Sequence, residues 1–180
     1  MKKVICITGT NAVGKTSVAK WIINQLGGIS FVKEGVSYMD SSKSAILGDY
    51  TKNSKFLGVD SFGCTNVVRH LVKKALEHAD TVFFEGEKCG TFGNNILLPL
   101  LEAEKSLFVL LYAPQNVINE RLKQRTGTGI KTRGVMLSQK QKANSFLKYR
   151  EIGIPAISFD TSKVTIDGVG GGILQRINNL

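Results

Sequence analysis

The chain has 180 residues, of which 42% are apolar and 21% charged, a composition typical of one globular domain (1–180) and not of a disordered chain. Its longest apolar run, 107–113, is far shorter than the roughly 20 residues that cross a bilayer. The apolar stretch at the start ends at Ile7, which argues against a signal peptide, so we expect a cytoplasmic protein. The spacing of the cysteines predicts reduced thiols without a metal: Cys6, Cys64 and Cys89.

The net charge of +10 is concentrated in one segment. Residues 121–150 contain nine Lys and Arg and no Asp or Glu. Such a segment favours a polyanionic partner, either nucleotide phosphates or a nucleic acid backbone, over an ordinary solvated helix face, where the charges are usually mixed in sign.

Short apolar runs alternate with helical periodicity along the chain. The strands that we expect are 4–8, 29–32, 81–84, 107–113 and 155–159. The helices that we expect are 16–26, 61–79, 95–103, 115–125, 138–150 and 173–178. Residues 36–60 are polar and weakly periodic, which predicts a loop with a broken helix. This alternation predicts an α/β fold in three layers, with a parallel five-stranded sheet covered by helices on both faces.

The segment 9–16 carries the clearest chemical signal. It reads Gly-Thr-Asn-Ala-Val-Gly-Lys-Thr, which fits the phosphate-loop pattern G-x-x-x-x-G-K-[ST], and it lies between an apolar strand and an amphipathic helix as that pattern requires. Glycines permit the tight turn, whose backbone N–H groups then point at phosphate oxygens, and the positive end of the helix adds to the attraction. The sequence therefore predicts a site for ATP and Mg²⁺.

Within this loop the roles divide by side chain. Lys15 would reach the β- and γ-phosphates, and the Thr16 hydroxyl would ligate Mg²⁺. The residues predicted to bind the nucleotide are Gly9, Asn11, Ala12, Val13, Gly14, Lys15, Thr16 and Ser17.

Carboxylates at the ends of predicted strands supply further candidates, because ligands of such sheets bind beyond the carboxyl ends of the strands. Glu85 ends the third strand and would hold Mg²⁺ through water or orient the acceptor, with Glu87 as a possible substitute. Glu34 follows the second strand and would act as a general base toward an acceptor hydroxyl, or bind the substrate if the acceptor is a phosphate.

Three arginines of the basic segment are candidates for a lid, which we place at about 121–140. Arg121 and Arg125 are four residues apart and share one helix face, and Arg133 follows the glycine-rich stretch 127–129. A planar guanidinium suits the equatorial oxygens of a phosphoryl group in transfer, so these side chains are predicted to be catalytic.

The chain resembles the nucleoside and nucleotide kinases, the group that includes thymidylate kinases and deoxynucleoside kinases. Beside the phosphate loop at the N-terminus, short segments carry this resemblance: 33–35 (Lys-Glu-Gly), 81–86 (Thr-Val-Phe-Phe-Glu-Gly), 119–125 (Asn-Glu-Arg-Leu-Lys-Gln-Arg), 152–155 (Ile-Gly-Ile-Pro) and 159–161 (Phe-Asp-Thr). The resemblance implies the sheet order 2-3-1-4-5.

Two departures from the thymidylate kinases concern the acceptor pocket. Those enzymes usually have Asp-Arg where this chain has Glu85-Gly86, and a proline is absent after Glu34. The resemblance therefore does not imply a specificity for thymidine.

Three functions remain in competition. The first is transfer of the γ-phosphoryl group of ATP to a free nucleoside or nucleotide. The second is transfer to a hydroxyl within a nucleic acid, for example hydroxymethylated uracil in DNA or a polynucleotide end, which the basic segment 121–150 favours. The third is a GTP-dependent switch, because 60–63 (Asp-Ser-Phe-Gly) fits D-x-x-G, although the chain has no Asn-Lys-x-Asp segment to read guanine.

Overall fold

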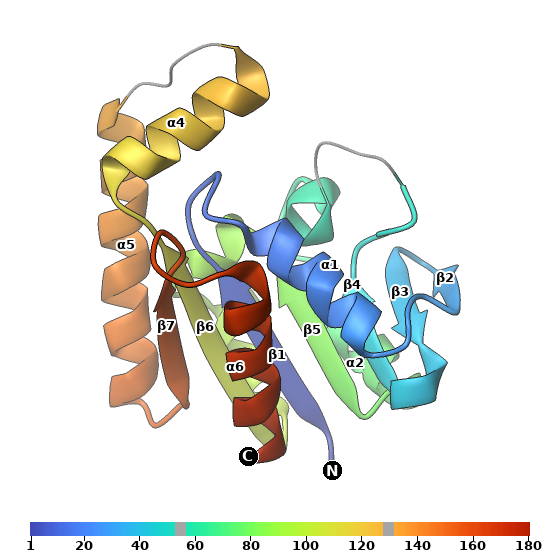
Figure 1. The fold of residues 1–180 in the computed structure, drawn as a ribbon. Helices are drawn as coiled ribbons and strands as arrows, with labels where there is room; N and C mark the ends of the chain where they lie inside the picture. The colour runs from blue at the N-terminus through green and yellow to red at the C-terminus, as the bar shows by residue number, and fades with distance from the viewer. Residues whose placement is uncertain (53–56, 128–131) are drawn as a thin grey trace.

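The protein is a three-layer α/β structure in which helices cover both faces of one sheet (Figure 1). The computed structural model describes residues 1–52, 57–127 and 132–180. The strands are β1 (Lys3–Thr8), β2 (Phe31–Lys33), β3 (Val36–Met39), β4 (Ser44–Leu47), β5 (Thr81–Glu85), β6 (Lys105–Tyr112) and β7 (Ala156–Asp160). The α-helices are α1 (Lys15–Gln25), α2 (Val68–His78), α3 (Asn94–Glu102), α4 (Gln115–Thr126), α5 (Thr132–Glu151) and α6 (Ile166–Asn178). The 3₁₀ helices are η1 (Asp40–Ser42), η2 (Gly58–Phe62) and η3 (Lys88–Gly90).

The central strand β1 contributes to two separate hydrophobic cores. Ile5 and Ile7 pack on one face with residues of α1 and α6, whereas Val4 and Cys6 pack on the other with residues of α2, α3 and α5. Successive side chains of a strand point to opposite faces, so a strand buried on both faces must be apolar throughout. This explains why 4–8 reads as a continuous apolar run.

The expected sheet is wrong in its strand count and order. In the described part of the chain the sheet has seven strands in the order β2-β3-β4-β5-β1-β6-β7. The strands β4, β5, β1, β6 and β7 run parallel, and this part alone follows the expected 2-3-1-4-5 when its strands are counted along the chain. The strands β2 and β3 add an antiparallel extension next to β4.

The error arises in residues 36–60, which we expected to be a loop with a broken helix. They contain β3 and β4, both buried along their whole length. Each strand has only four residues and includes buried serine, which reads as a loop residue. The Ser37 hydroxyl donates to Gly48 O at 2.7 Å and accepts from Tyr50 N at 3.1 Å, so its burial leaves no hydrogen-bonding group unpaired. The predicted strand 29–32 corresponds to β2, at the edge of the sheet.

The helices follow the sequence more closely, with shifted ends. The helix expected over 61–79 begins only at Val68, because η2 and a turn precede it. The final helix begins at Ile166, and the Thr165 side chain caps it by accepting from Gly168 N at 3.3 Å. In the described residues no helix has the length and apolar character needed to span a membrane.

The contact between α1 and α6 gives a test of the packing. A Cβ at Gly170 would fall 2.5 Å from Trp21 Cζ3, whereas a Cβ at Gly171 would meet no atom within 4 Å. We expect Gly170→Ala to have a free energy of unfolding about 1–3 kcal/mol lower than that of Gly171→Ala, because the gain in helix propensity is common to both and only the first is overpacked. Denaturant titration of both variants measures the difference, and equal stabilities would contradict this packing of α1 against α6.

Candidate functional site

The phosphate loop 9–16 connects the carboxyl end of β1 to the first residue of α1. Gly14 precedes the helix with φ 91°, and Ala12 also has a positive φ of 61°. A side chain at position 14 would be strained, which is the physical reason for glycine there. The Lys15 side chain folds back over the loop, is 7% exposed, and donates from Nζ to Thr10 O at 3.0 Å. The loop thus holds its own cation through the carbonyl oxygen of Thr10.

Glu85, at the end of β5, faces this loop. The carboxylate accepts hydrogen bonds at Oε1 from Thr16 Oγ1 (3.1 Å) and from Tyr50 OH (2.9 Å), and the residue is 1% exposed. Burial raises the pKa of the Glu85 carboxyl, and the charge of Lys15 and the Tyr50 hydrogen bond partly offset this increase. A hydroxyl and a carboxylate oxygen in contact are hard donors of the kind that Mg²⁺ prefers. The two side chains therefore fit the predicted metal site.

A cleft of about 520 Å³ opens over the loop, a size suited to a small-molecule ligand. Residues of the loop, of η2 and of α4 line it together with the segment after β7. From α4, Arg121 donates through Nη1 to Ala12 O (3.3 Å) and Thr161 Oγ1 (3.0 Å), and through Nη2 to Thr161 O (2.7 Å). This guanidinium thus joins the phosphate loop to the segment after β7, with Val164 and Ile166 supplying apolar wall beside it.

The structure gathers most of the predicted site residues around this cleft. The predicted nucleotide-binding residues that line it are Asn11, Ala12, Val13, Gly14, Lys15, Thr16 and Ser17. Gly9 lies beneath them in the turn, where a Cβ would be 2.6 Å from Val13 Cγ2. Arg121 and Arg125 both line the cleft. Arg133 lies in the first turn of α5, and its side chain falls outside the described part of the structure, as does the stretch 128–131 of the expected lid.

Glu34 is not brought into this group. It lies in the turn between β2 and β3, near the edge of the sheet, and its carboxylate forms an ion pair with Lys74 Nζ at 2.7 Å. That hydrogen bond lowers the pKa of the Glu34 carboxyl. Glu34 lines a separate, smaller hollow beside α2, together with Tyr38 and His78. The strand next to β5 is β4, not β2. We predicted Glu34 as a site residue because it follows β2, which we expected to end at the crevice.

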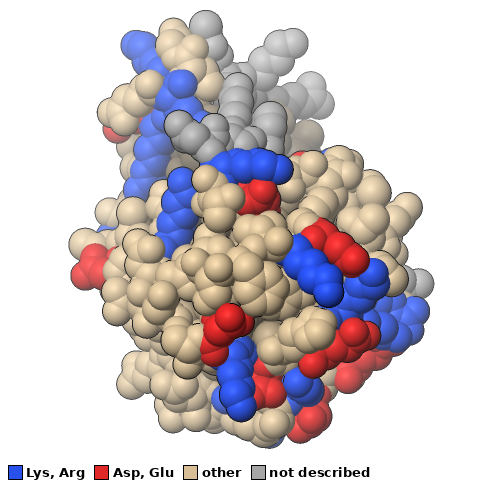
Figure 2. Space-filling model, turned by 90° about the vertical axis from the view of Figure 1, so that its right-hand side faces the viewer, with Lys and Arg blue, Asp and Glu red and all other residues tan. Residues whose placement is uncertain are grey.

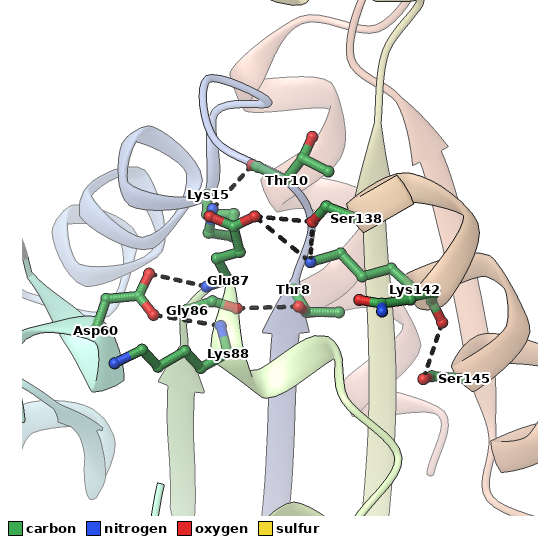
Figure 3. Close-up of polar contacts among 11 residues, drawn as sticks. Thr8, Thr10, Lys15, Asp60, Gly86, Glu87, Lys88, Ser138, Lys142 and Ser145 are labelled. Atoms are coloured by element: carbon green, nitrogen blue, oxygen red, sulfur yellow. Dashed lines mark hydrogen bonds and ion pairs between the residues drawn. The ribbon is translucent and has the colours of Figure 1, made fainter. Parts of the chain in front are cut away.

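A second polar group lies beside Lys15, and Figure 3 shows its members. Both carboxylate oxygens of Asp60 accept backbone N–H groups, from Glu87 at 2.8 Å and Lys88 at 3.3 Å. The Glu87 side chain meets α5, where Ser138 Oγ donates to Glu87 Oε1 at 2.8 Å. Asp60, the first residue of the D-x-x-G match, therefore shapes the turn after β5 from a 3₁₀ helix and does not stand at a strand end.

Several residues of the site were missed from the sequence. Tyr50 follows β4, in the segment that we expected to be irregular, and nothing in its neighbourhood marks it. Thr161 lies in the segment 159–161, which carries part of the family resemblance. The sequence therefore contained a signal that could have identified Thr161 as a site residue. Ser138 and Lys142 lie in the basic helix α5. Counting the charges of this helix does not show that Lys142 is buried while other lysines are exposed. Among the residues described, no three His, Cys, Asp or Glu side chains form a group that could hold a metal ion.

No protein-family model matches the chain, and no curated protein matches its sequence. Solved structures do match its fold. YorR from Bacillus subtilis, in complex with phosphorylated GDP, has a TM-score of 0.60 at 14% identity, with 97% of this chain and 95% of that one covered. A deoxyadenosine kinase from M. mycoides with its products dCMP and dCDP also has a TM-score of 0.60, at 13% identity, covering 98% and 100%.

A tunicamycin resistance protein from Deinococcus radiodurans is a further match, with a TM-score of 0.55 at 15% identity over 98% and 96% of the two chains. At such identities the similarity establishes the fold. The chain therefore has the same fold as these proteins, one of which is a deoxyadenosine kinase.

The buried carboxyl of Glu85 predicts a specific dependence of stability on pH. Because its pKa in the folded protein lies above the unfolded value, the neutral form is favoured on folding, and this contribution is lost as the pH rises through the folded pKa. Glu85→Gln keeps an acceptor for Thr16 and Tyr50 but cannot ionise. We expect the stability of this variant, relative to wild type, to increase as the pH rises above about 4.3, by about 1.4 kcal/mol for each unit of pKa difference.

Denaturant unfolding of both proteins between pH 4 and pH 8, without nucleotide or magnesium, measures this difference. A difference that is constant with pH, or that decreases as the pH rises, would contradict the burial of an ionisable Glu85.

Proposed function

We propose that the protein is an ATP-dependent kinase that transfers the γ-phosphoryl group to a nucleoside- or nucleotide-type acceptor. The observation that carries the proposal is the contact between the phosphate loop and the end of β5, where Thr16 meets Glu85 beside the buried Lys15. A glycine-rich turn with a surface lysine would not need a buried carboxylate opposite it. This arrangement is suited to a bound triphosphate with its metal ion.

The chain's own groups can perform the phosphoryl transfer mainly by position and charge. The loop amides and the N-terminus of α1 would hold the phosphates, and Lys15 would exchange its bond with Thr10 O for phosphate oxygens. Thr16 and Glu85 would hold Mg²⁺, which neutralises phosphate charge when bound. Arg121 and Arg125, which line the same cleft, would bring guanidinium groups to the charge that develops on the transferred group.

The identity of the acceptor class draws on the comparisons. The deoxyadenosine kinase is described with bound dCTP and with dCMP and dCDP, and YorR with phosphorylated GDP. These ligands are nucleotides of different bases, and this supports a nucleoside- or nucleotide-type acceptor for this chain.

A second candidate, a kinase of hydroxyls within nucleic acid, is favoured by the distribution of charge on α4 and α5. The exposed basic residues of these helices are Lys123, Arg125, Lys140, Lys148 and Arg150. At the opposite, β2–β3 end of the sheet, Figure 2 shows basic and acidic side chains next to one another. Glu34, in the turn between β2 and β3, forms an ion pair with Lys74. Between Glu120 in α4 and Glu151 at the end of α5, the sequence contains no acidic residue, and this supports the binding of a phosphate backbone.

Removal of the Lys15 ammonium tests the proposal. Lys15→Ala should reduce phosphoryl transfer from ATP by at least about 10²–10³-fold, the usual effect of losing a preorganised charge at the reacting group. Its circular dichroism and unfolding transition should stay close to those of wild type. Transfer at a rate near wild type would refute the assignment of the loop.

A panel of acceptors separates the candidates. Radiolabelled ATP is incubated with the protein and with nucleosides, nucleotides, plain DNA and hydroxymethylated DNA, and the labelled product is identified. Label on a free nucleoside or nucleotide supports the first candidate. Label on DNA, with acceptor binding that weakens linearly in log salt, supports the second. Preference for GTP over ATP without any transferred label would instead support a switch protein.

A further inference from the structure

A second cleft, of about 600 Å³, lies between the carboxyl ends of β6 and β7 and the helix α5. Among the residues described, none lines both this cleft and the one over the phosphate loop. Its wall is largely apolar and includes Leu110, Tyr112, Pro114 and Met136. We term this cleft the α5 pocket. Its volume lies in the range of pockets that hold a small molecule.

Short side chains leave this space open where α5 covers the sheet. Ala143 on α5 and Ser158 on β7 both line the pocket. The helix is held at this edge by Gln139, whose Nε2 donates to Ala113 O at 2.7 Å. Of the large apolar side chains in the wall, Tyr112 and Met136 are exposed. The pocket therefore presents apolar surface to solvent, and a ligand with an apolar body would cover it.

Thr10 places a buried polar group without a partner at this pocket. The residue is 2% exposed and lines the pocket, and in Figure 3 its side chain points away from Lys15. The Thr10 carbonyl accepts from Lys15 Nζ, but no described group forms a hydrogen bond with Thr10 Oγ1. Buried hydroxyls are nearly always paired, because an unpaired one lowers the stability of the folded protein. A ligand seated against Thr10 would supply the missing partner.

The charged side chains that line the pocket leave one cation without a counter-charge. Asp160 Oδ2 lies 3.8 Å from Lys163 Nζ, and Lys142 Nζ lies 3.6 Å from Glu87 Oε1. Lys140 also lines the pocket and is exposed, and in the described part of the chain it forms no ion pair. The pocket therefore favours a ligand with one negative charge.

We propose that the α5 pocket is a second ligand site, which binds a small apolar anion: an aromatic or other apolar body with one carboxylate or sulfonate. The body would lie against Tyr112, Pro114 and Met136, the anionic group would lie near Lys140, and one polar atom would pair with the Thr10 hydroxyl. A nucleotide suits this pocket poorly, because its base and sugar carry many polar groups that an apolar wall leaves unpaired. The proposal does not depend on the proposed kinase function.

Two fluorescent probes that differ only in charge test the site in the full-length protein. Anilinonaphthalene sulfonate is an aromatic anion, and N-phenylnaphthylamine is the same molecule without the sulfonate. We expect saturable binding of both probes. Ala143→Trp, which fills the pocket, should raise both Kd values at least about tenfold. Asn144→Trp, the next and exposed position of α5, does not line the pocket and should leave both Kd values unchanged.

The charge of Lys140 has its own readout. Lys140→Met should raise the Kd of anilinonaphthalene sulfonate about two- to fivefold and leave that of N-phenylnaphthylamine unchanged, because only the first probe carries the anion. Lys123→Met removes the same charge from an exposed position of α4 outside the pocket, and it is the matched control. An equal loss of affinity for both probes in Lys140→Met would overturn the assignment of Lys140 to an anion.

The unpaired hydroxyl of Thr10 gives a third comparison. Thr10→Val keeps the shape of the side chain and removes the hydroxyl. We expect a higher denaturant midpoint for the free protein and a Kd for both probes that is about two- to tenfold higher, because the hydroxyl is unpaired without a ligand and paired with one. Unchanged Kd values would contradict a contact between Thr10 and the ligand.

Two results would overturn the site as a whole. Probe affinities that Ala143→Trp leaves unchanged would place the probes elsewhere, and displacement of both probes by magnesium with a non-hydrolysable ATP analogue would place them over the phosphate loop. Because such probes also bind partly unfolded chains, each variant must keep the cooperative unfolding of wild type. Should Ala143→Trp lose it, the two probes with Lys140→Met decide the matter. Phosphoryl transfer is decided separately, by Lys15→Ala.

Discussion

The site depends on one pair of buried charges, Lys15 at the start of α1 and Glu85 at the carboxyl end of β5. Each is nearly inaccessible to water, at 7% and 1% exposure. Without a ligand each is satisfied by short contacts, Lys15 by Thr10 O and Glu85 by Thr16 and Tyr50. Burying charges of this kind lowers the stability of the folded protein. Such charges cluster at functional sites, where a bound ligand compensates them. A bound triphosphate with its metal would compensate both of them together.

The sheet explains why these two charges lie close enough to influence each other. The strand β1 lies between β5 and β6 in the sheet. The order of the strands reverses there, and a crevice forms at such a point, beyond the carboxyl ends of the strands. On one side, Arg121 and Thr161 border the phosphate loop at the β6–β7 half. On the other, Asp60 lines the cleft over the loop and accepts from the backbone N–H of Glu87 after β5.

The sequence predicted the features that rest on local rules. Spacing alone located the glycine-rich turn, the buried strand before it and the helix after it, because the turn that Gly14 permits is contained within a few residues. The sequence did not predict β3 and β4. Their burial depends on residues far along the chain, and each strand contains a buried serine, a residue type that favours the prediction of a loop. For the same reason it pointed to Glu34 at the end of β2 and missed Tyr50, which follows β4 and reaches Glu85. Glu87 and Ser138, which are joined by a hydrogen bond, are 51 positions apart, so no local pattern could show their contact.

The most direct test of the account is where Mg·ATP binds. Backbone amide resonances of the ¹⁵N-labelled protein are followed by NMR during titration with magnesium and a non-hydrolysable ATP analogue. The account predicts saturable shifts at Asn11 to Ser17 and at Thr161, with the Lys15 amide among the largest. Saturable shifts that leave these amides unmoved, or no binding at millimolar analogue, would contradict it.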